Sequence, residues 1–346
     1  MTRTGGAYRS GSLPGGTVID IHCHVSTPAL DELVRPVFTP ERDPFTYFSG
    51  PASTAYNDTH FTEIIPKLSV PDVRLRDMDA MGVDIQAISV APPQYYYWTE
   101  PDLGRKLARL QNENIARIVA GHPDRFVGLG TVPLQDIDAT LEELDAIAGE
   151  FGFPGIEICT SVNGADFDDP RFLPFFERVR DLDLTVVVHP NGFSDGQRLA
   201  AYYLINTIGM PLDSTIFLAR TILGGVFERV RGLKVVVVHG GGYLPSYPAR
   251  YDHAWRTRSD ARNVTSEPPS TYLRQLFYDT VLFDPFDLSI LIQRYGADHV
   301  LLGTDYPYDM GETDPVGLVC AVEGLNDDER RLILGGNAAR LLRLKQ

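Results

Sequence analysis

The sequence contains few cysteines, and none of them lie close together. Cys23, Cys159 and Cys320 are the only three in 346 residues. Their odd number and wide spacing exclude a CxxC metal or redox motif and a disulfide framework. This cysteine usage is typical of a reducing compartment, and we expect a cytoplasmic protein.

Long apolar runs and an excess of basic charge are also missing. No stretch approaches the roughly 18 apolar residues of a transmembrane helix, and residues 1–6 lack the apolar core of a signal peptide. The net charge is −15, from 46 acidic and 31 basic residues, which argues against a nucleic-acid surface and an anionic membrane face. We therefore expect neither nucleic acid nor a membrane as a partner. A local arginine pair can still attract a small anion, so the expected partner is a small molecule.

What the sequence has instead is a recurring pattern of apolar segments that end in histidine or aspartate. Four valines precede His239, three precede His189, residues 300–302 lead towards Asp305, and the first such segment contains His22 and His24. Consecutive apolar residues predict strands buried on both faces, as in a parallel sheet. The carboxyl ends of parallel strands are where such folds build their functional sites.

The order of elements favours a single (β/α)8 TIM barrel over residues 17–346, after a flexible N-terminal tail at residues 1–16. Strands alternate with helices, and no shift of composition marks a linker. A doubly wound sheet is the alternative, but no Gly-x-Gly-x-x-Gly follows a strand. The expected strands are 18–25, 84–90, 126–132, 155–159, 185–189, 235–239, 276–281 and 300–305, and the expected helices are 73–81, 103–120, 136–149, 170–182, 211–230, 287–295 and 327–344.

A long insertion follows the first strand. The segment from Ser26 to Ser69 is rich in proline and aromatic residues and has poor periodicity. An irregular segment of this length inside a compact domain is usually functional. We therefore expect a loop that forms a lid or a pocket wall. The sequence assigns no role to His60, which lies within this loop.

Four of the strand-end residues predict a metal site. His22 and His24 are two residues apart on a strand, so their side chains point to the same face. With His189 and Asp305 they form a set that suits one Zn²⁺ or another divalent first-row ion with an open water position. For a single histidine, capping a strand is the simpler interpretation; for all four residues together, a metal site is favoured.

His239 is a fifth candidate at these strand ends. One ion rarely needs every imidazole, and a pKa near neutrality suits a group that accepts and donates protons. We therefore predict that His239 is the acid/base beside the metal. The alternatives are a fifth ligand and a core histidine.

The sequence resembles the amidohydrolase superfamily (amidohydrolase-related family 2). Within it, the chain is similar to the aminocarboxymuconate-semialdehyde decarboxylase branch of metal-dependent non-oxidative decarboxylases. The resemblance rests on the His-x-His strand, His189-Pro190, His239 with three glycines, and residues 303–307, Gly-Thr-Asp-Tyr-Pro. Two-metal members of such barrels commonly carry a lysine on the fourth strand, and residues 155–159 have none, which favours a single ion, most simply Zn²⁺, with Mn²⁺ as the alternative.

The resemblance also implies roles for individual residues. It implies His22, His24, His189 and Asp305 as ligands, His239 and Asp305 as catalytic groups, and a homodimer or higher homo-oligomer in which Arg250 reaches the neighbouring site. Arg258 matches a second arginine near the substrate's carboxylates; surface arginines are the alternative for both.

The chain departs from that family in its expected pocket wall. Residues 56–62 contain no arginine where the family has arginines, and Asn191 replaces a tryptophan. Tyr97, within a run of four aromatic residues, supplies an aromatic wall instead, unless that run is only a packed loop. Arg250, Arg258, Asn191 and Tyr97 are the predicted substrate contacts.

We favour a decarboxylase, a carbon–carbon lyase, of a small aromatic or unsaturated carboxylic acid. A hydrolase or hydratase that uses water activated by the same metal is the alternative, and a non-enzymatic metal-binding scaffold is a third reading. The three glycines after His239 and the long first insertion favour an open site and hence an enzyme.

Overall fold

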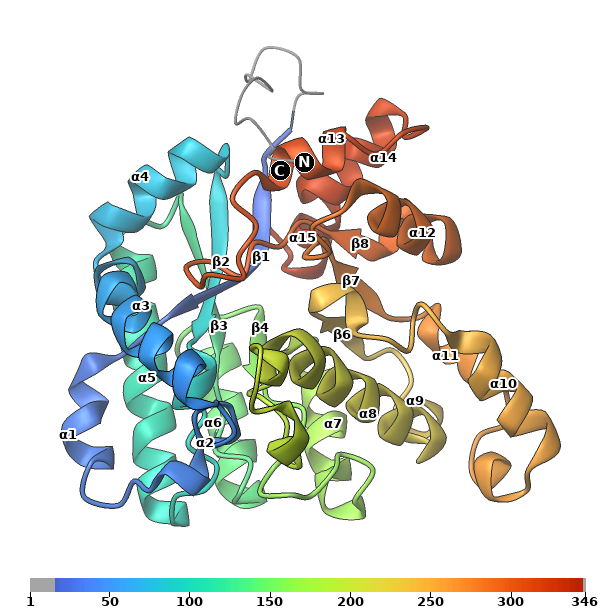
Figure 1. The fold of residues 1–346 in the computed structure, drawn as a ribbon, viewed down its shortest axis with the longest axis horizontal. Helices are drawn as coiled ribbons and strands as arrows, with labels where there is room; N and C mark the ends of the chain where they lie inside the picture. Colours follow the sequence, from blue (N-terminus) through green and yellow to red (C-terminus); the bar gives the residue numbers. More distant parts are fainter. Residues whose placement is uncertain (1–15, 345–346) are drawn as a thin grey trace.

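A computed structural model describes residues 16–344, and its centre is an eight-stranded parallel sheet in the order β1 to β8 (Figure 1). Apart from Gly16, the expected N-terminal tail lies outside the described residues. The strands are β1 (Ile19–Val25), β2 (Ile85–Val90), β3 (Phe126–Gly130), β4 (Gly155–Ile158), β5 (Thr185–Val188), β6 (Lys234–Val237), β7 (Phe277–Asp279) and β8 (Val300–Leu301).

The sheet closes on itself between β8 and β1. The backbone N–H of Ile21 donates to the carbonyl of Leu302 at 3.0 Å, and that of His24 donates to the carbonyl of Tyr306 at 2.8 Å. This closure confirms the TIM barrel and excludes the doubly wound sheet. The expected extension of β8 to Asp305 was wrong, because the ladder ends at Leu301. The following residues are held instead by the carbonyl of His22, which accepts from the N–H of Asp305 at 2.8 Å.

The valine-rich strands are buried on both faces, as their sequence predicts. Val187 and Val236 pack with Ile21 and Leu301 in one apolar cluster. Their neighbours, such as Val186 and Val235, belong to a second cluster that includes the surrounding helices. Because successive strand residues point to opposite faces, one set fills the barrel and the other binds the helical layer.

Helices surround the barrel on the outside (Figure 1). The predicted helix over residues 211–230 was wrong in one respect: it breaks at Gly224 and Gly225, where Gly225 has φ +77°. The outer helices are α4 (Pro71–Met81), α5 (Pro101–Gly121), α6 (Ile137–Gly149), α7 (Leu173–Asp181), α8 (Met210–Leu223), α9 (Val226–Arg229), α12 (Pro285–Tyr295), α13 (Pro315–Cys320), α14 (Asp327–Arg331) and α15 (Asn337–Leu341).

The segment after β1 is helical, contrary to the expected irregular loop. It contains α1 (Asp31–Val34), α2 (Pro44–Tyr47) and the 19-residue helix α3 (Pro51–Ser69). Pro66 lies inside α3, which is one reason why the sequence did not predict a helix there. We call α3 the lid helix, because its inward face borders the cavity described below.

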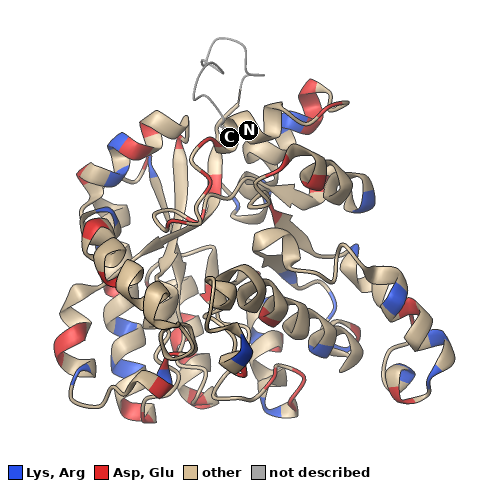
Figure 2. Ribbon diagram, viewed as in Figure 1, with Lys and Arg blue, Asp and Glu red and all other residues tan. Residues whose placement is uncertain are grey.

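An arm formed by α10 (Pro248–Thr257) and α11 (Pro269–Leu273) extends to one side of the barrel (Figure 1). Charged residues lie mainly on the outer helices, and α10 carries both signs (Figure 2). Among residues 16–344 no helix is long and apolar enough to cross a membrane.

Candidate metal centre

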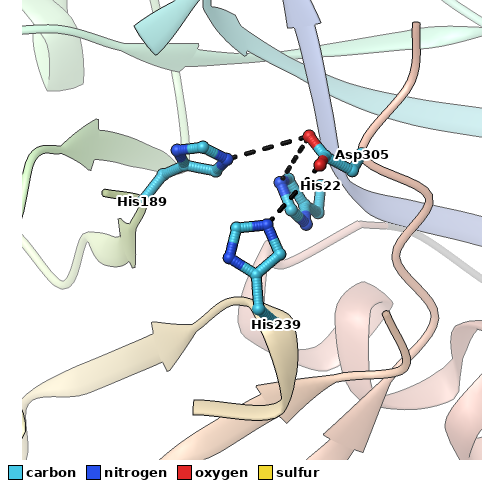
Figure 3. Close-up of side chains that lie close together, drawn as sticks. All are labelled: His22, His189, His239 and Asp305. Carbon is cyan, nitrogen blue, oxygen red and sulfur yellow. Dashed lines mark ion pairs between the residues drawn. The ribbon is translucent and has the colours of Figure 1, made fainter. Parts of the chain in front are cut away.

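The strand ends bring the predicted histidines together around one carboxylate. Nε2 of His22 and Nε2 of His24 each lie 3.3 Å from Oδ1 of Asp305, and Nε2 of His189 lies 3.7 Å from it. All four side chains are buried. Figure 3 shows His22, from β1, and His189, which follows β5, directed at Asp305.

Each of the three histidines is held by a hydrogen bond from its other ring nitrogen. Nδ1 of His22 donates to Oδ2 of Asp279 at 2.6 Å, Nδ1 of His24 to the carbonyl of Val90 at 3.1 Å, and Nδ1 of His189 to the carbonyl of Pro190 at 2.6 Å. An acceptor at Nδ1 fixes the tautomer in which Nε2 carries a free lone pair. The three Nε2 atoms are therefore prepared to bind a cation.

The converging atoms lack any other partner. Nε2 of His22, His24 and His189 and Oδ1 of Asp305 are buried and make no hydrogen bond within the described chain. Buried polar atoms are nearly always paired, and unpaired ones are energetically costly. Three imidazole nitrogens and one carboxylate oxygen are the donor set of a divalent first-row metal ion. The residues present therefore fit a metal.

The charges around the centre favour a cation in the same place. Burial lowers the pKa of His189 well below its ordinary value, so this imidazole stays neutral. Burial also opposes protonation of His22, yet the neighbouring carboxylates of Asp305 and Asp279 raise its pKa well above the ordinary value. A positive charge is thus stabilised between these carboxylates, whether a proton or a metal ion supplies it.

His239 lies on the other side of Asp305. Its Nε2 is 3.5 Å from Oδ2 of Asp305, whereas His24 faces Oδ1. Its side chain is 14% exposed, and its buried Nδ1 has no hydrogen-bond partner among residues 16–344. The ring therefore lacks the orienting acceptor that each of the other three histidines has.

Two overlapping ligand sets are consistent with these positions. One contains His24 with His22, His189 and Asp305. The other replaces His24 by His239, and its four ligand atoms lie within 4.8 Å of one another. The held ring of His24 favours the first set, and the unheld, more exposed ring of His239 favours a group that moves protons.

The backbone at the site adopts conformations that are unusual for residues with side chains. His239 has φ 55° and Asp305 has φ 58°, in the left-handed region that non-glycine residues seldom occupy. The chain after His239 also needs glycine, because a Cβ on Gly242 would lie 2.3 Å from the carbonyl oxygen of Pro211. Such strain concentrates at functional sites.

Two cavities meet at Asp305, and we call them the narrow lobe and the wide lobe. Asp305, Asn206 and Met210 line both. The narrow lobe, ≈ 40 Å³, lies under the lid helix and is also lined by His189 and Asn191. The wide lobe, ≈ 590 Å³, is lined by His239, by many apolar side chains and by the charged residues Asp287 and Arg294. An acid at the metal centre thus has room on the side of His239.

The predicted substrate contacts are placed unevenly. Asn191 reaches the narrow lobe, where its Nδ2 donates to Asp43 at 3.2 Å. Tyr97 lines a separate outer cavity and accepts a hydrogen bond from the N–H of Cys159 at 3.4 Å. Arg250 and Arg258 are exposed on the arm, outside both lobes, and Arg258 pairs with Asp260. Within one chain, therefore, only Asn191 of the four adjoins the centre.

Sequence reasoning missed several buried groups behind the ligands. Asp279, at the end of β7, joins His22 to the backbone N–H of Gly240, at 2.9 Å. Glu157, on β4 where two-metal relatives carry a lysine, accepts hydrogen bonds from Ser89 at 2.7 Å and Tyr95 at 2.8 Å. The usable signal was the same as for the histidines: a carboxylate at or near the end of a buried strand.

Comparison with known proteins agrees with the fold. A model of the amidohydrolase family matches residues 19–344. The chain belongs to this family. It is 35% identical, over 82% of its length and 79% of the relative, to the 2-amino-3-carboxymuconate-6-semialdehyde decarboxylase of Dictyostelium discoideum.

Solved structures of decarboxylases have a similar fold. The 5-carboxyvanillate decarboxylase LigW from Sphingomonas paucimobilis superimposes with a TM-score of 0.85 at 27% identity, over 96% of this chain and 100% of that one. A dihydroxybenzoic acid decarboxylase from Polaromonas sp. JS666, with bound manganese and the inhibitor 2-nitroresorcinol, has a TM-score of 0.81 at 23% identity, over 96% and 98%. These likenesses confirm the predicted resemblance to amidohydrolase-type decarboxylases.

Proposed function

We propose that this protein is a metal-dependent carboxy-lyase that removes CO₂ from a small aromatic or unsaturated carboxylic acid without an oxidant. The observation that carries the proposal is the convergence of four unpartnered, buried ligand atoms, from His22, His24, His189 and Asp305, beside a cavity that His239 lines. Relatives with this fold that are named as decarboxylases support the choice of reaction.

We propose one divalent ion, held by those four residues. The three-nitrogen, one-oxygen donor set suits Zn²⁺, which we expect, and Mn²⁺ is the alternative that the manganese-containing Polaromonas enzyme supports. When bound, the ion supplies a Lewis acid that orients substrate oxygens and stabilises negative charge.

The residues of the chain divide the remaining work. The carbon–carbon bond to the carboxylate breaks, CO₂ departs, and the electron pair stays on the adjacent carbon. His239, which lines the wide lobe beside Asp305, would donate the proton that this carbon takes up. Asp305 would hold both the ion and, through Oδ2, the orientation of the His239 ring.

Substrate binding and assembly complete the proposal. Asn191 would contact the substrate inside the narrow lobe, and Tyr97 would form part of the outer wall. Because Arg250 and Arg258 lie on the projecting arm (Figure 1), their role requires a homodimer or higher homo-oligomer in which the arm reaches a neighbouring site. Three free cysteines support a cytoplasmic location.

The test compares two products of the same reaction mixture. Metal-loaded protein is incubated in ¹⁸O water with a panel of hydroxybenzoates and muconate-type acids carrying ¹³C in the carboxyl group. We expect ¹³CO₂ that depends on the metal and a product without ¹⁸O bound to carbon. Incorporation of ¹⁸O into the organic product without CO₂ release would replace decarboxylation by hydrolysis or hydration.

A further inference from the structure

The inward face of the lid helix changes from apolar to polar along its length. Ile64 and Leu68 are buried against Ala91, next to Phe61 and Tyr308. One and two turns earlier the same face carries His60 and Asn57 in place of apolar residues, because side chains three and four positions apart share a face. These two residues lie where the helix borders the narrow lobe.

Neither polar group finds a partner in the protein. Asn57 is 6% exposed, and its side chain makes no hydrogen bond within residues 16–344. Nε2 of His60 is buried and also unpaired, while its ring stacks on Tyr56. Buried polar groups are nearly always hydrogen-bonded. An apolar residue in place of His60 would avoid this cost, so a bound group that pairs with Nε2 of His60, beside the Asn57 amide, explains their presence.

The narrow lobe has the size and charge for a small neutral group. No lysine or arginine is among the described residues that line it, whereas Asp305 and Asp309 are. A second carboxylate there would face negative charge without a counter-ion. A water molecule needs about 10–15 Å³ in this measure, so ≈ 40 Å³ admits one substituent rather than a ring.

We propose that Asn57 and His60 form a specificity subsite for a neutral polar substituent, a hydroxyl or a carbonyl, on the acid. The ring of the acid would occupy the wide lobe, with its reacting carboxylate near Asp305. Acids that place such a substituent in the narrow lobe are then preferred over acids that would place a second carboxylate there. The inference rests on the proposed function, because it places the reacting acid at the neighbouring metal centre.

The experiment uses matched benzoates that share a 2-hydroxyl group. The second substituent is hydrogen, hydroxyl or carboxylate, and it is placed in turn at ring positions 3 to 6. For wild type we expect the hydroxyl to raise kcat/KM by about tenfold over hydrogen at one position, the usual value of a hydrogen bond, and the carboxylate to lower it. In Asn57→Leu the ratio of kcat/KM between the hydroxyl-bearing and the hydrogen-bearing acid should fall to near one, mainly through a change in KM. His60→Phe should lower the same ratio.

The matched control is Thr62→Leu, on the exposed side of the lid helix. It should keep both the preference and the metal content, and metal content should also be unchanged in Asn57→Leu. If Asn57→Leu keeps the wild-type preference, or if a carboxylate raises kcat/KM as much as a hydroxyl at the same ring position, the subsite assignment is overturned.

Binding separates this inference from the proposed function. Calorimetric titration of the same benzoates into metal-loaded wild type and Asn57→Leu requires no turnover. If no benzoate releases CO₂, but wild type binds the hydroxyl-bearing member more tightly and Asn57→Leu does not, the proposed function fails and the subsite stands. If CO₂ is released, but the ratio of dissociation constants for the hydroxyl-bearing and hydrogen-bearing benzoates is the same in wild type and Asn57→Leu, the proposed function stands and the subsite is overturned.

Discussion

At the scale of single residues, the proposed metal centre relies on the groups behind the four candidate ligands as well as on those ligands. Asp279 receives a hydrogen bond from His22 through Oδ2 and one from the N–H of Gly240 through Oδ1. One carboxylate therefore orients a ligand and fixes the turn that follows His239. Groups that orient a metal-binding histidine commonly contribute strongly to metal affinity.

Replacing Asp279 tests this role. In Asp279→Ala the ring of His22 loses its acceptor, so the affinity for Zn²⁺ should fall about 10–100-fold. Competition with a chelator measures the affinity. The control is Asp124→Asn, an exposed carboxyl far along the chain from the centre, which should bind Zn²⁺ as wild type does. Equal affinity in Asp279→Ala and wild type would contradict the orienting role.

The convergence of the four candidate ligands could be predicted from the sequence, whereas the groups behind them were missed. His22 and His24 share a face because strand residues alternate, and His189 and Asp305 follow other apolar segments, so periodicity alone brings them to one end of the barrel. Asp279 also lies at a strand end, as the last residue of β7, but no second residue at a fixed spacing indicates which group this carboxylate supports. Its role follows only from its contact with a residue 257 positions away.

At the scale of elements, the strands were predictable and the connections were less so. Val235–Val238 and Thr185–Val188 indicate buried strands through composition alone. The lid helix was missed because its sequence contains Pro66 and few apolar residues on a regular stripe. The break between α8 and α9 depends on Gly225 in the left-handed region, which a helical apolar pattern does not reveal.

Helix α8 carries a carboxyl group whose ionisation affects stability. Burial raises the pKa of Asp213 from 3.8 to about 6, although a hydrogen bond from Thr160 opposes the shift. The folded protein therefore favours the protonated form, and it becomes less stable as the pH rises from about 4 to 6 and this group ionises. Above pH 6 the whole penalty is present, and below pH 4 it is absent.

Asp213→Asn should remove this penalty. About two pKa units correspond to at most about 3 kcal/mol, so the variant should be more stable than wild type at pH 7.5 by up to that amount. The advantage should shrink towards zero as the pH approaches 4. Urea unfolding at pH 7.5 and pH 4.5 measures both values. An advantage of the same size at both pH values would contradict the assignment of the pKa.

At the scale of the whole molecule, the single barrel carries one projecting arm whose arginines do not reach the centre of their own chain. The barrel was predictable from eight alternating strands and helices. The position of Arg250 relative to a site was not predictable in the same way, because it depends on how chains assemble. An arm that extends beside an open cavity suits an active unit built from two chains.

Hybrid dimers test this arrangement. Arg250→Ala chains and His239→Ala chains should each be inactive alone, because each lacks one part of every site. Mixed under conditions that exchange subunits, they should regain about a quarter of the wild-type rate per chain, because random pairing makes about half of the dimers mixed and each mixed dimer has one intact site out of two. Exchange is followed with differently tagged chains. Proven exchange without recovered activity would place Arg250 outside the neighbouring site.

The central claim is that His24 holds the ion and His239 moves the proton. The most direct measurement is the metal content of His24→Ala and His239→Ala, loaded with Zn²⁺ side by side and analysed for metal per chain. The account predicts that His24→Ala retains little Zn²⁺. It predicts that His239→Ala keeps about one ion per chain, while its rate falls by ~10²–10⁴. Loss of the ion from His239→Ala with full retention in His24→Ala would contradict the account and assign His239 to the metal.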